Sequence, residues 1–211
     1  MRIALTGSRG FIGGRLREVL ENQGHEITEW DVELGKDIHD FQLNGEEYVI
    51  HLAAFADLRA SIDNAQAFWD NNVTPTTRIQ RMCYEAGVPL IYASSSCIHN
   101  WAASPYGISK KVNEETAMPG QVGLRFSTVY GPNARESMLV GRLVSGNIKY
   151  LTNHKRDFIH VDDVVGFIVL LMEKDLHTVD RAYDVGTNKG VLVSELGQAV
   201  GYQDLPVEDG D

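Results

Sequence analysis

Two kinds of segment alternate along the chain. Short runs of strand-like composition lie at 2–6, 26–30, 48–52, 89–94 and 121–127. Between them, longer segments carry apolar residues at helical spacing and predict helices over 11–23, 64–86, 106–116 and 162–174, the second with a break near Pro75. Strands that alternate with helices in this way predict a parallel sheet with helices on both faces.

The first predicted strand runs directly into three glycines, Gly7, Gly10 and Gly13. Glycine within a helix costs about 1 kcal/mol relative to alanine, so these positions require a compensating role. Between a strand and a helix, glycines allow a tight turn, close approach of a pyrophosphate and close helix–strand packing. The alternative is a plain glycine-rich turn, but the context favours a dinucleotide diphosphate at the amino terminus of the helix.

A carboxylate follows the second predicted strand. Asp31 ends the stretch EITEWD, near the spacing expected for an acid that binds the ribose hydroxyls. Such an acid repels the 2′-phosphate of NADP, so Asp31 predicts NAD as the cofactor. Arg9, inside the glycine loop, is the one feature that favours NADP, and we give Asp31 the greater weight because it is expected directly at the ribose.

Composition, charge and cysteine content exclude several classes of protein. The 211 residues include 43% hydrophobic residues and carry a net charge of −10, which argues against nucleic acid or an anionic membrane as a partner. The chain has no apolar run of membrane-spanning length, and its start, MRIAL, is not typical of a signal peptide. Cys83 and Cys97 fit neither a disulfide framework nor a zinc motif, so we expect a cytoplasmic protein without a metal.

Six motifs occur in order: TGSRGFIGG, GKDIHD, VIHLAA, SPYGISK, LRFSTVYGP and RDFIHVDD. Together they resemble the extended short-chain dehydrogenase/reductase family, the NAD-dependent epimerases and dehydratases of nucleotide sugars, over nearly the whole chain. The resemblance implies an α/β, Rossmann-like, doubly wound parallel sheet. It further implies a NAD-binding domain over 1–127, completed by later segments, and a reduced substrate-binding portion over 128–211 that is interleaved with it.

The resemblance also assigns cofactor-binding residues. The GKDIHD motif implies contact with adenine, and the end of VIHLAA implies cover for the cofactor. The complete expected set is Gly7, Arg9, Gly10, Phe11, Ile12, Gly13, Asp31, Asp37, Ile38, Leu52, Ala53, Ala54, Asn72, Ala93, Ser94, Tyr106 and Lys110.

Three residues are candidates for catalysis. Tyr106 and Lys110 are four apart on a predicted helix and share a face. A phenol has a pKa of about 10, and a nearby ammonium is expected to lower that pKa so that Tyr106 acts as a base. The resemblance adds a serine whose hydroxyl bonds the substrate oxygen from which Tyr106 removes the proton. Alignment on Ile98 selects Ser95, although a shift of one residue would select a neighbouring serine.

The neighbours of Ser95 bear on the reaction. Dehydratases of the family carry an Asp–Glu pair where this chain has Ser96 and Cys97, which disfavours dehydration. Cys97 matches a cysteine of GDP-fucose synthase, but Asn133 stands where that enzyme has a histidine. Thr128 resembles the UDP-glucuronate 4-epimerases. The expected substrate-binding residues are Arg59, Cys97, Thr128 and Arg156.

We therefore expect a NAD-dependent enzyme that epimerises C4 of a UDP-hexose or UDP-hexuronate by transient oxidation. A homodimer is expected through the helices over 64–86 and 106–116, the first of which carries Phe68, Trp69, Ile79 and Met82. The alternatives are a nucleotide-sugar reductase and a NAD(H)-binding protein with a degenerate substrate site. Family members continue with a segment that closes over the sugar nucleotide, and the sequence leaves open whether this chain continues past Asp211.

Overall fold

The computed structural model describes residues 1–209 and divides the chain into two compact units. The first unit comprises Met1–Phe126 and Val165–Asp184, and the second comprises Ser127–Val164 and Val185–Asp211. The chain passes from one unit to the other within helix α7 (Val161–Met172) and within strand β9 (Ala182–Val185).

A sheet forms the centre of the first unit. Within residues 1–209 it has six strands in the order β2-β1-β3-β4-β5-β9. The pairs β1–β2, β1–β3, β3–β4 and β4–β5 are parallel. The first five strands are β1 (Arg2–Thr6), β2 (Glu26–Trp30), β3 (Tyr48–His51), β4 (Leu90–Ser95) and β5 (Gln121–Phe126). A mixed α/β unit with a parallel sheet confirms the predicted fold class.

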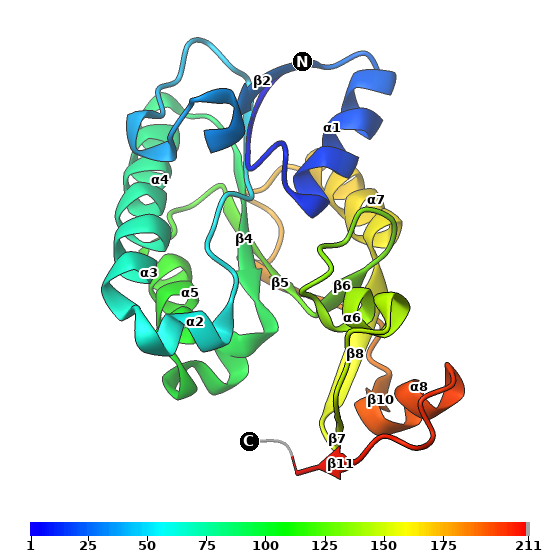
Figure 1. Ribbon diagram of the computed structural model, residues 1–211. Helices are drawn as coiled ribbons and strands as arrows, with labels where there is room; N and C mark the ends of the chain where they lie inside the picture. The colour runs from blue at the N-terminus through cyan, green and yellow to red at the C-terminus, as the bar shows by residue number, and fades with distance from the viewer. Residues whose placement is uncertain (210–211) are drawn as a thin grey trace. The chain divides into compact units, whose positions relative to one another are not determined.

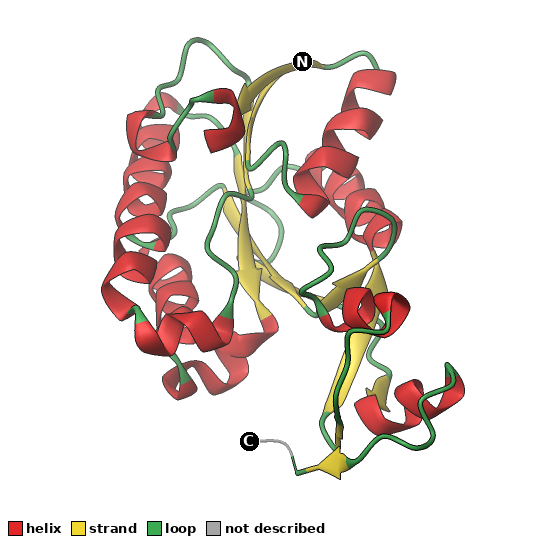
Figure 2. Ribbon diagram, in the orientation of Figure 1, coloured by secondary structure: helices red, strands yellow, loops and turns green. Residues whose placement is uncertain are grey.

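Helices cover both faces of this sheet (Figure 1). Helix α1 (Phe11–Asn22) and α7 lie on one face, and α2 (Leu58–Asp63), α3 (Ala65–Asn72), α4 (Thr74–Ala86) and α5 (Pro105–Thr116) lie on the other. Figure 2 shows how loops and short turns join these layers. The 3₁₀ helices are η1 (Val32–Leu34), η2 (Ile38–Asp40) and η3 (Ser96–Ala103). No helix in the described part of the chain is long and apolar enough to span a membrane.

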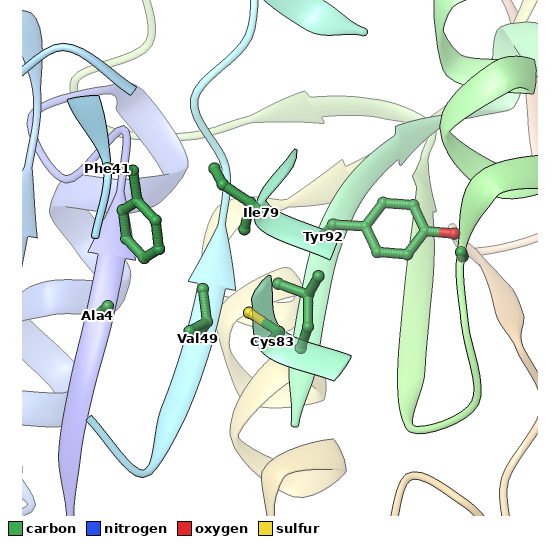
Figure 3. Packing of buried hydrophobic residues seen from close by; sticks show 8 residues of the cluster. Ala4, Phe41, Val49, Ile79, Cys83 and Tyr92 are labelled. Carbon is green, nitrogen blue, oxygen red and sulfur yellow. The ribbon is translucent and has the colours of Figure 1, made fainter. Parts of the chain in front are cut away.

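One core cluster packs α4 against the sheet (Figure 3). Ile79 and Cys83, one helical turn apart on α4, are completely buried with Val49 of β3. Burial of each such side chain stabilises the fold by about 1.5–3 kcal/mol. Tyr92 of β4 stands opposite Gly123 of β5, and a Cβ at Gly123 would lie 2.8 Å from the tyrosine Oη. Glycine is therefore required beside the buried ring.

The predicted elements of the first unit are confirmed to within about two residues, with one helix divided. The segment over 64–86 forms α3 and α4, separated at Val73. Pro75 lies in the first turn of α4, where its missing N–H costs no helical hydrogen bond. Helix α2 was not predicted, because its six residues are too few for a periodic pattern. It begins at Leu58, after the N-cap residue Asp57, whose side chain accepts a hydrogen bond from the Ala60 N–H.

The second unit is built from short elements, which periodicity did not detect. Among residues 1–209 it has a three-stranded sheet, β10-β8-β6, and a two-stranded sheet, β11-β7. Near the C-terminus, Val207–Glu208 form β11 and pair with Leu151–Thr152. The elements are β6 (Thr128–Tyr130), α6 (Leu139–Ser145), β7 (Leu151–Thr152), β8 (Lys155–His160), β10 (Gly190–Leu192), α8 (Val193–Ala199) and β11 (Val207–Glu208).

Candidate cofactor and active site

The strand order of the first unit reverses next to β1. From β1 the chain passes to β2 on one side and then to β3 on the other. In open parallel sheets, ligands bind beyond the carboxyl ends of the strands at such a reversal. The glycine loop after β1 and the segment Leu52–Ala54 after β3 occupy this place. Residues far apart in sequence thus meet where the topology predicts a binding site.

The three glycines have different structural roles. Gly7 has a left-handed φ of +69°, and a Cβ there would lie 2.8 Å from the Ala53 nitrogen. A Cβ on Gly13 would lie 1.9 Å from the Gly7 oxygen, so Gly13 allows α1 to pack against the loop. Gly10 is exposed and has the extended backbone of an N-cap. Gly7 and Gly13 therefore serve packing, and Gly10 leaves the outer side of the loop bare.

The amino terminus of α1 is suited to an anion. Within residues 1–209, no side chain caps this helix at Gly10, and its first turn contains no acidic residue. Uncapped N–H groups and the helix dipole both favour a negative group at this end. The predicted contacts Phe11 and Ile12 lie in the same turn.

Asp31 is held rigidly at the end of β2. Its Oδ2 accepts a hydrogen bond from the Arg9 N–H at 2.9 Å, and its Oδ1 accepts one from the Glu33 N–H at 3.0 Å. Each carboxylate oxygen has a second lone pair, so this carboxylate can still accept hydrogen bonds from ribose hydroxyls. The Arg9 guanidinium points to another acid, Glu29, at 2.8 Å.

The predicted adenine segment is fixed by a residue that the sequence did not reveal. Asp37 caps η2 by accepting a hydrogen bond from the His39 N–H at 2.9 Å. Arg78 of α4 donates through Nη2 to the carbonyl oxygens of Ile38, at 3.1 Å, and His39, at 2.7 Å. Ile38 is 4% exposed and anchors the segment in the core. Arg78 thus orients the backbone that carries Asp37.

A buried histidine fixes the segment after β3. The imidazole of His51 contacts the Oγ1 atoms of Thr6, at 2.7 Å, and Thr76, at 2.8 Å. Thr6 Oγ1 also accepts a hydrogen bond from the Ala53 N–H at 3.1 Å. Burial, aided by the positive charge of Lys110, lowers the pKa of His51 to about 3. The histidine is therefore neutral and serves as a structural link between three elements.

Asn72 is also engaged within the protein. Its Oδ1 accepts a hydrogen bond from the Phe55 N–H at 2.8 Å, and its Nδ2 donates to the Phe55 oxygen at 2.9 Å. The same Nδ2 donates to Ser109 Oγ at 3.3 Å, and the side chain is completely buried. The resemblance implied contact with the cofactor, whereas this geometry orients the segment that follows Ala54.

The structure brings Ser95, Tyr106 and Lys110 together. Ser95 ends β4, and its side chain lies close enough to the Tyr106 phenol to favour a lower pKa of that phenol. Lys110 Nζ lies 5.8 Å from the centroid of the Tyr106 ring and donates to the oxygen of Ala93 at 2.9 Å. All three candidate side chains are less than a tenth exposed.

The neighbouring serines have other environments. Ser94 Oγ donates to Glu114 Oε1 at 2.6 Å, and Ser96 is exposed. The carboxylate of Glu114 also accepts hydrogen bonds from Arg125, at 2.9 Å from Nε and 2.7 Å from Nη2. Glu114 therefore joins α5 to the ends of β4 and β5, and Ser95 is the serine that faces the phenol.

The prediction that Lys110 lowers the pKa of Tyr106 is wrong for the protein without cofactor. Burial raises the pKa of Tyr106 to about 12, although the side chain of Ser95 opposes this rise. Burial also lowers the pKa of Lys110 to about 8. Desolvation disfavours the charged form of both groups and outweighs the attraction between them.

The four candidate substrate residues lie in different units. Arg59 is exposed on α2, and Cys97 is half-buried in η3, close enough to Tyr106 to contribute to its raised pKa. Thr128 of β6 and Arg156 of β8 belong to the second unit. Over the described part of the chain, no three His, Cys, Asp or Glu side chains are grouped to hold a metal ion.

These groups fit a dinucleotide. The uncapped start of α1 offers N–H donors to a diphosphate, and the fixed carboxylate of Asp31 offers acceptors to ribose. Lys110 retains two of its three N–H donors after its bond to Ala93. Gly10 is exposed and carries no side chain, so the backbone of the loop is accessible to such a ligand at this position.

Comparison with protein families agrees with this geometry. Residues 3–186 match the model of the NAD-dependent epimerase/dehydratase family. The chain belongs to this family. The resemblance stated from the sequence is thereby confirmed, and NAD is confirmed as the cofactor of the family to which the chain belongs.

Curated relatives extend the comparison. Protein CapI of Staphylococcus aureus is 28% identical over 276 aligned positions, which cover 95% of this chain and 82% of the relative. A UDP-glucuronate 4-epimerase of Thermodesulfobacterium geofontis (strain OPF15) is 30% identical and covers 76% of this chain and 68% of the relative. The alignment with CapI is longer than this chain of 211 residues, so CapI contains inserted segments.

Solved structures confirm the fold. MoeE5 in complex with UDP-glucuronic acid and NAD is 28% identical, with a TM-score of 0.84 over 100% of this chain and 86% of MoeE5. TunA, an NAD-dependent NDP-hexosamine 5,6-dehydratase, has a TM-score of 0.88 over 100% of this chain and 84% of TunA, at 24% identity.

Proposed function

We propose that the protein is a NAD-dependent nucleotide-sugar epimerase that inverts C4 of a UDP-hexose or UDP-hexuronate. The observation that carries the proposal is the burial of Ser95 and Tyr106 next to each other, with Lys110 Nζ 5.8 Å from the centroid of the tyrosine ring. The relative from Thermodesulfobacterium geofontis, named a UDP-glucuronate 4-epimerase, and the MoeE5 complex with UDP-glucuronic acid and NAD support the substrate class.

The residues of the first unit that would hold NAD follow from the site. The amino terminus of α1 would hold the diphosphate, and Asp31 would accept hydrogen bonds from the adenosine ribose. Asp37 and Ile38 would contact the adenine. Lys110 would donate to the nicotinamide ribose while it retains Ala93 as a partner.

In the proposed mechanism, Tyr106 removes the proton of the C4 hydroxyl and Ser95 donates a hydrogen bond to the same oxygen. NAD bound beside C4 would supply the hydride acceptor and donor, so that C4 would be oxidised to a ketone and then reduced on its other face. Tyr106 returns the proton to the oxygen, so neither a proton nor a reducing equivalent is lost. Lys110 lies beside the Tyr106 ring, where its charge favours the phenolate and opposes the burial that raises the pKa of Tyr106.

The absence of an acid pair favours epimerisation over dehydration. Elimination of water requires a base for carbon and an acid for the leaving hydroxyl, and Ser96 and Cys97 do not provide a carboxylate pair. The alternatives are a reductase that releases its cofactor at each turnover and a NAD(H)-binding protein with a degenerate substrate site. The buried, adjacent arrangement of Ser95, Tyr106 and Lys110 favours an enzyme over the second alternative.

The test supplies UDP-glucose, UDP-glucuronate and their acetamido analogues to purified protein without added cofactor. Product formation is followed by NMR, and the protein is assayed for retained NAD. We expect the C4 epimer of one of these sugars, and a much slower formation of the same product by the Tyr106→Phe variant. A 4-keto-6-deoxy product, or turnover that requires stoichiometric NADPH, would overturn the proposal.

We also propose a homodimer through the helical face formed by α3, α4 and α5. Two of the four residues cited for this contact, Phe68 and Ile79, are buried within the chain. Trp69, at 44% exposure, and Tyr84, at 52%, remain available to a second copy. Light scattering at micromolar concentration tests this, and a monomer would reject it.

A further inference from the structure

Glu29 lies at the centre of a charged cluster next to the ribose carboxylate. It stands on β2 two residues before Asp31, so the two side chains leave the same face of the strand. Its Oε1 accepts a hydrogen bond from Arg9 Nη2 at 2.8 Å, and its Oε2 lies 3.7 Å from Arg17 Nε. Its backbone oxygen accepts a hydrogen bond from Lys36 Nζ at 3.0 Å. Three cations therefore converge on one residue.

Arg9 is bound at once to Glu29 of β2 and to Asp31, the residue that follows β2. Its N–H donates to Asp31 Oδ2 at 2.9 Å, while its guanidinium donates to Glu29. The backbone of Arg9 is therefore next to the carboxylate that would bind ribose, but its charge is directed to another acid. The side chain of Glu29 is 18% exposed, which makes this ion pair less screened than one on the open surface.

This pairing bears on the choice between NAD and NADP. NADP carries an additional phosphate on the ribose 2′-oxygen, and a free arginine near that position is the usual means of binding it. An arginine already hydrogen-bonded to a carboxylate must break that bond before it can bind the phosphate. The negative charge of Glu29 also adds to the repulsion from Asp31.

We propose that Glu29 is a specificity-determining residue, which favours NAD over NADP by holding the guanidinium of Arg9. This inference rests on the proposed NAD site. It assigns to Glu29 an effect on cofactor choice that acts through Arg9, in addition to the direct repulsion by Asp31. A merely structural link between the glycine loop and β2 would change the affinities for both cofactors equally.

The experiment measures the dissociation constants of NAD and NADP by calorimetry at low ionic strength for the cofactor-free wild type, Glu29→Gln and Glu29→Gln/Arg9→Met. The ratio of the NADP constant to the NAD constant is expected to fall about tenfold in Glu29→Gln, the size of one charge-assisted hydrogen bond. In the double variant most of this gain is expected to be lost, because the released guanidinium is absent.

Two further variants keep the test decisive. Glu21→Gln removes the more distant partner of Arg17, at 3.8 Å, and should leave the ratio unchanged. Arg9→Met alone should change the ratio far less than Glu29→Gln, since the charge of Arg9 is already paired in the wild type. A large loss of NADP affinity in Arg9→Met would show that Arg9 is free to bind the phosphate and would overturn the inference, even if Glu29→Gln failed to fold.

The outcomes separate this inference from the proposed function. An unchanged ratio in Glu29→Gln, in a wild type that binds NAD, overturns the role of Glu29 alone. The same holds if the double variant keeps the full gain in NADP affinity. A wild type that binds neither cofactor overturns both the proposed NAD site and the role of Glu29.

Discussion

The two ends of the candidate site are held in place in different ways. Around the glycine loop, ion pairs between partly exposed side chains fix the backbone, with Arg9 at 34% and Glu29 at 18% exposure. Around the phenol, Tyr106 is 8% and Lys110 is 3% exposed, and the lysine is bound by a backbone oxygen. The glycine loop is held by ion pairs between partly exposed side chains, and the surroundings of the phenol are held by buried hydrogen bonds.

This difference shows where each kind of change is tolerated. Exposed or partly exposed ion pairs contribute little to stability, so their residues can change and alter which cofactor is bound. A buried ionisable group is costly to charge and costly to leave without a partner. We therefore expect cofactor selectivity to depend on the partly exposed ion pairs, where substitutions cost little stability. We expect catalysis to depend on the buried groups, where substitutions cost much more.

The largest expected effect is at the buried end. Tyr106→Phe removes one hydroxyl and little volume, so the variant should fold and bind NAD as the wild type does. Turnover should fall about 10²–10⁴-fold, the usual contribution of a general acid–base group. The measurement is kcat for the sugar epimerised by the wild type, together with NAD affinity and the melting temperature.

Tyr84→Phe is the matched control, because Tyr84 is 52% exposed on α4. It should retain wild-type turnover. If Tyr106→Phe also retained near-full turnover, Tyr106 would not be the base.

A second effect concerns the dependence of stability on pH. The pKa of Lys110 is about 8 in the folded protein and 10.5 as a free side chain, so between these values the unfolded chain holds more protons. The contribution of Lys110 should therefore raise stability with pH across this window, by up to about 3 kcal/mol for the full difference. Above about pH 9 the buried Cys83 thiol, whose pKa burial raises to about 12, acts in the opposite direction, so the rise is clearest between about pH 7 and about pH 9. Denaturant unfolding of the cofactor-free protein between about pH 7 and about pH 10 measures the slope.

Lys110→Met removes the titrating group and should flatten this rise. Lys111→Met, the neighbouring substitution on α5, should keep the wild-type slope, since Lys111 is an exposed partner of Glu115. A wild-type slope in Lys110→Met would contradict the assignment of the buried charge.

A smaller effect is expected at the adenine segment. Arg78→Met removes two hydrogen bonds to the backbone of Ile38 and His39. Affinity for NAD and for AMP should fall about tenfold, because the segment loses its charge-assisted tie, whereas affinity for nicotinamide mononucleotide should not change. Equal losses for all three ligands would indicate a general loss of structure instead.

The smallest effect is expected at the exposed pair of α5. Lys111→Met should produce no measurable change in NAD affinity, turnover or melting temperature, because exposed ion pairs contribute little. A clear loss of turnover would mean that a surface charge on α5 affects catalysis at Tyr106. It would contradict the proposed difference between the partly exposed and the buried end of the site.

The sequence by itself determined the elements of the first unit and much of the site. Regular periodicity predicted β1, α1 and α5, because their apolar residues face one continuous core. Strand, glycines and helix in succession predicted the turn at Gly7, and the distance of four residues predicted that Tyr106 and Lys110 share a face. These features depend on contacts that are local in the chain.

Only the tertiary structure decided the residues that support the site. Arg78 lies 40 residues from Ile38, Glu114 lies 20 from Ser94, and His51 lies 45 from Thr6. No local pattern reports such pairs, since a sheet brings strand ends together irrespective of their separation in sequence. The same reason explains the pKa of Tyr106: spacing placed Lys110 beside the phenol, but the burial that outweighs its charge comes from the whole fold.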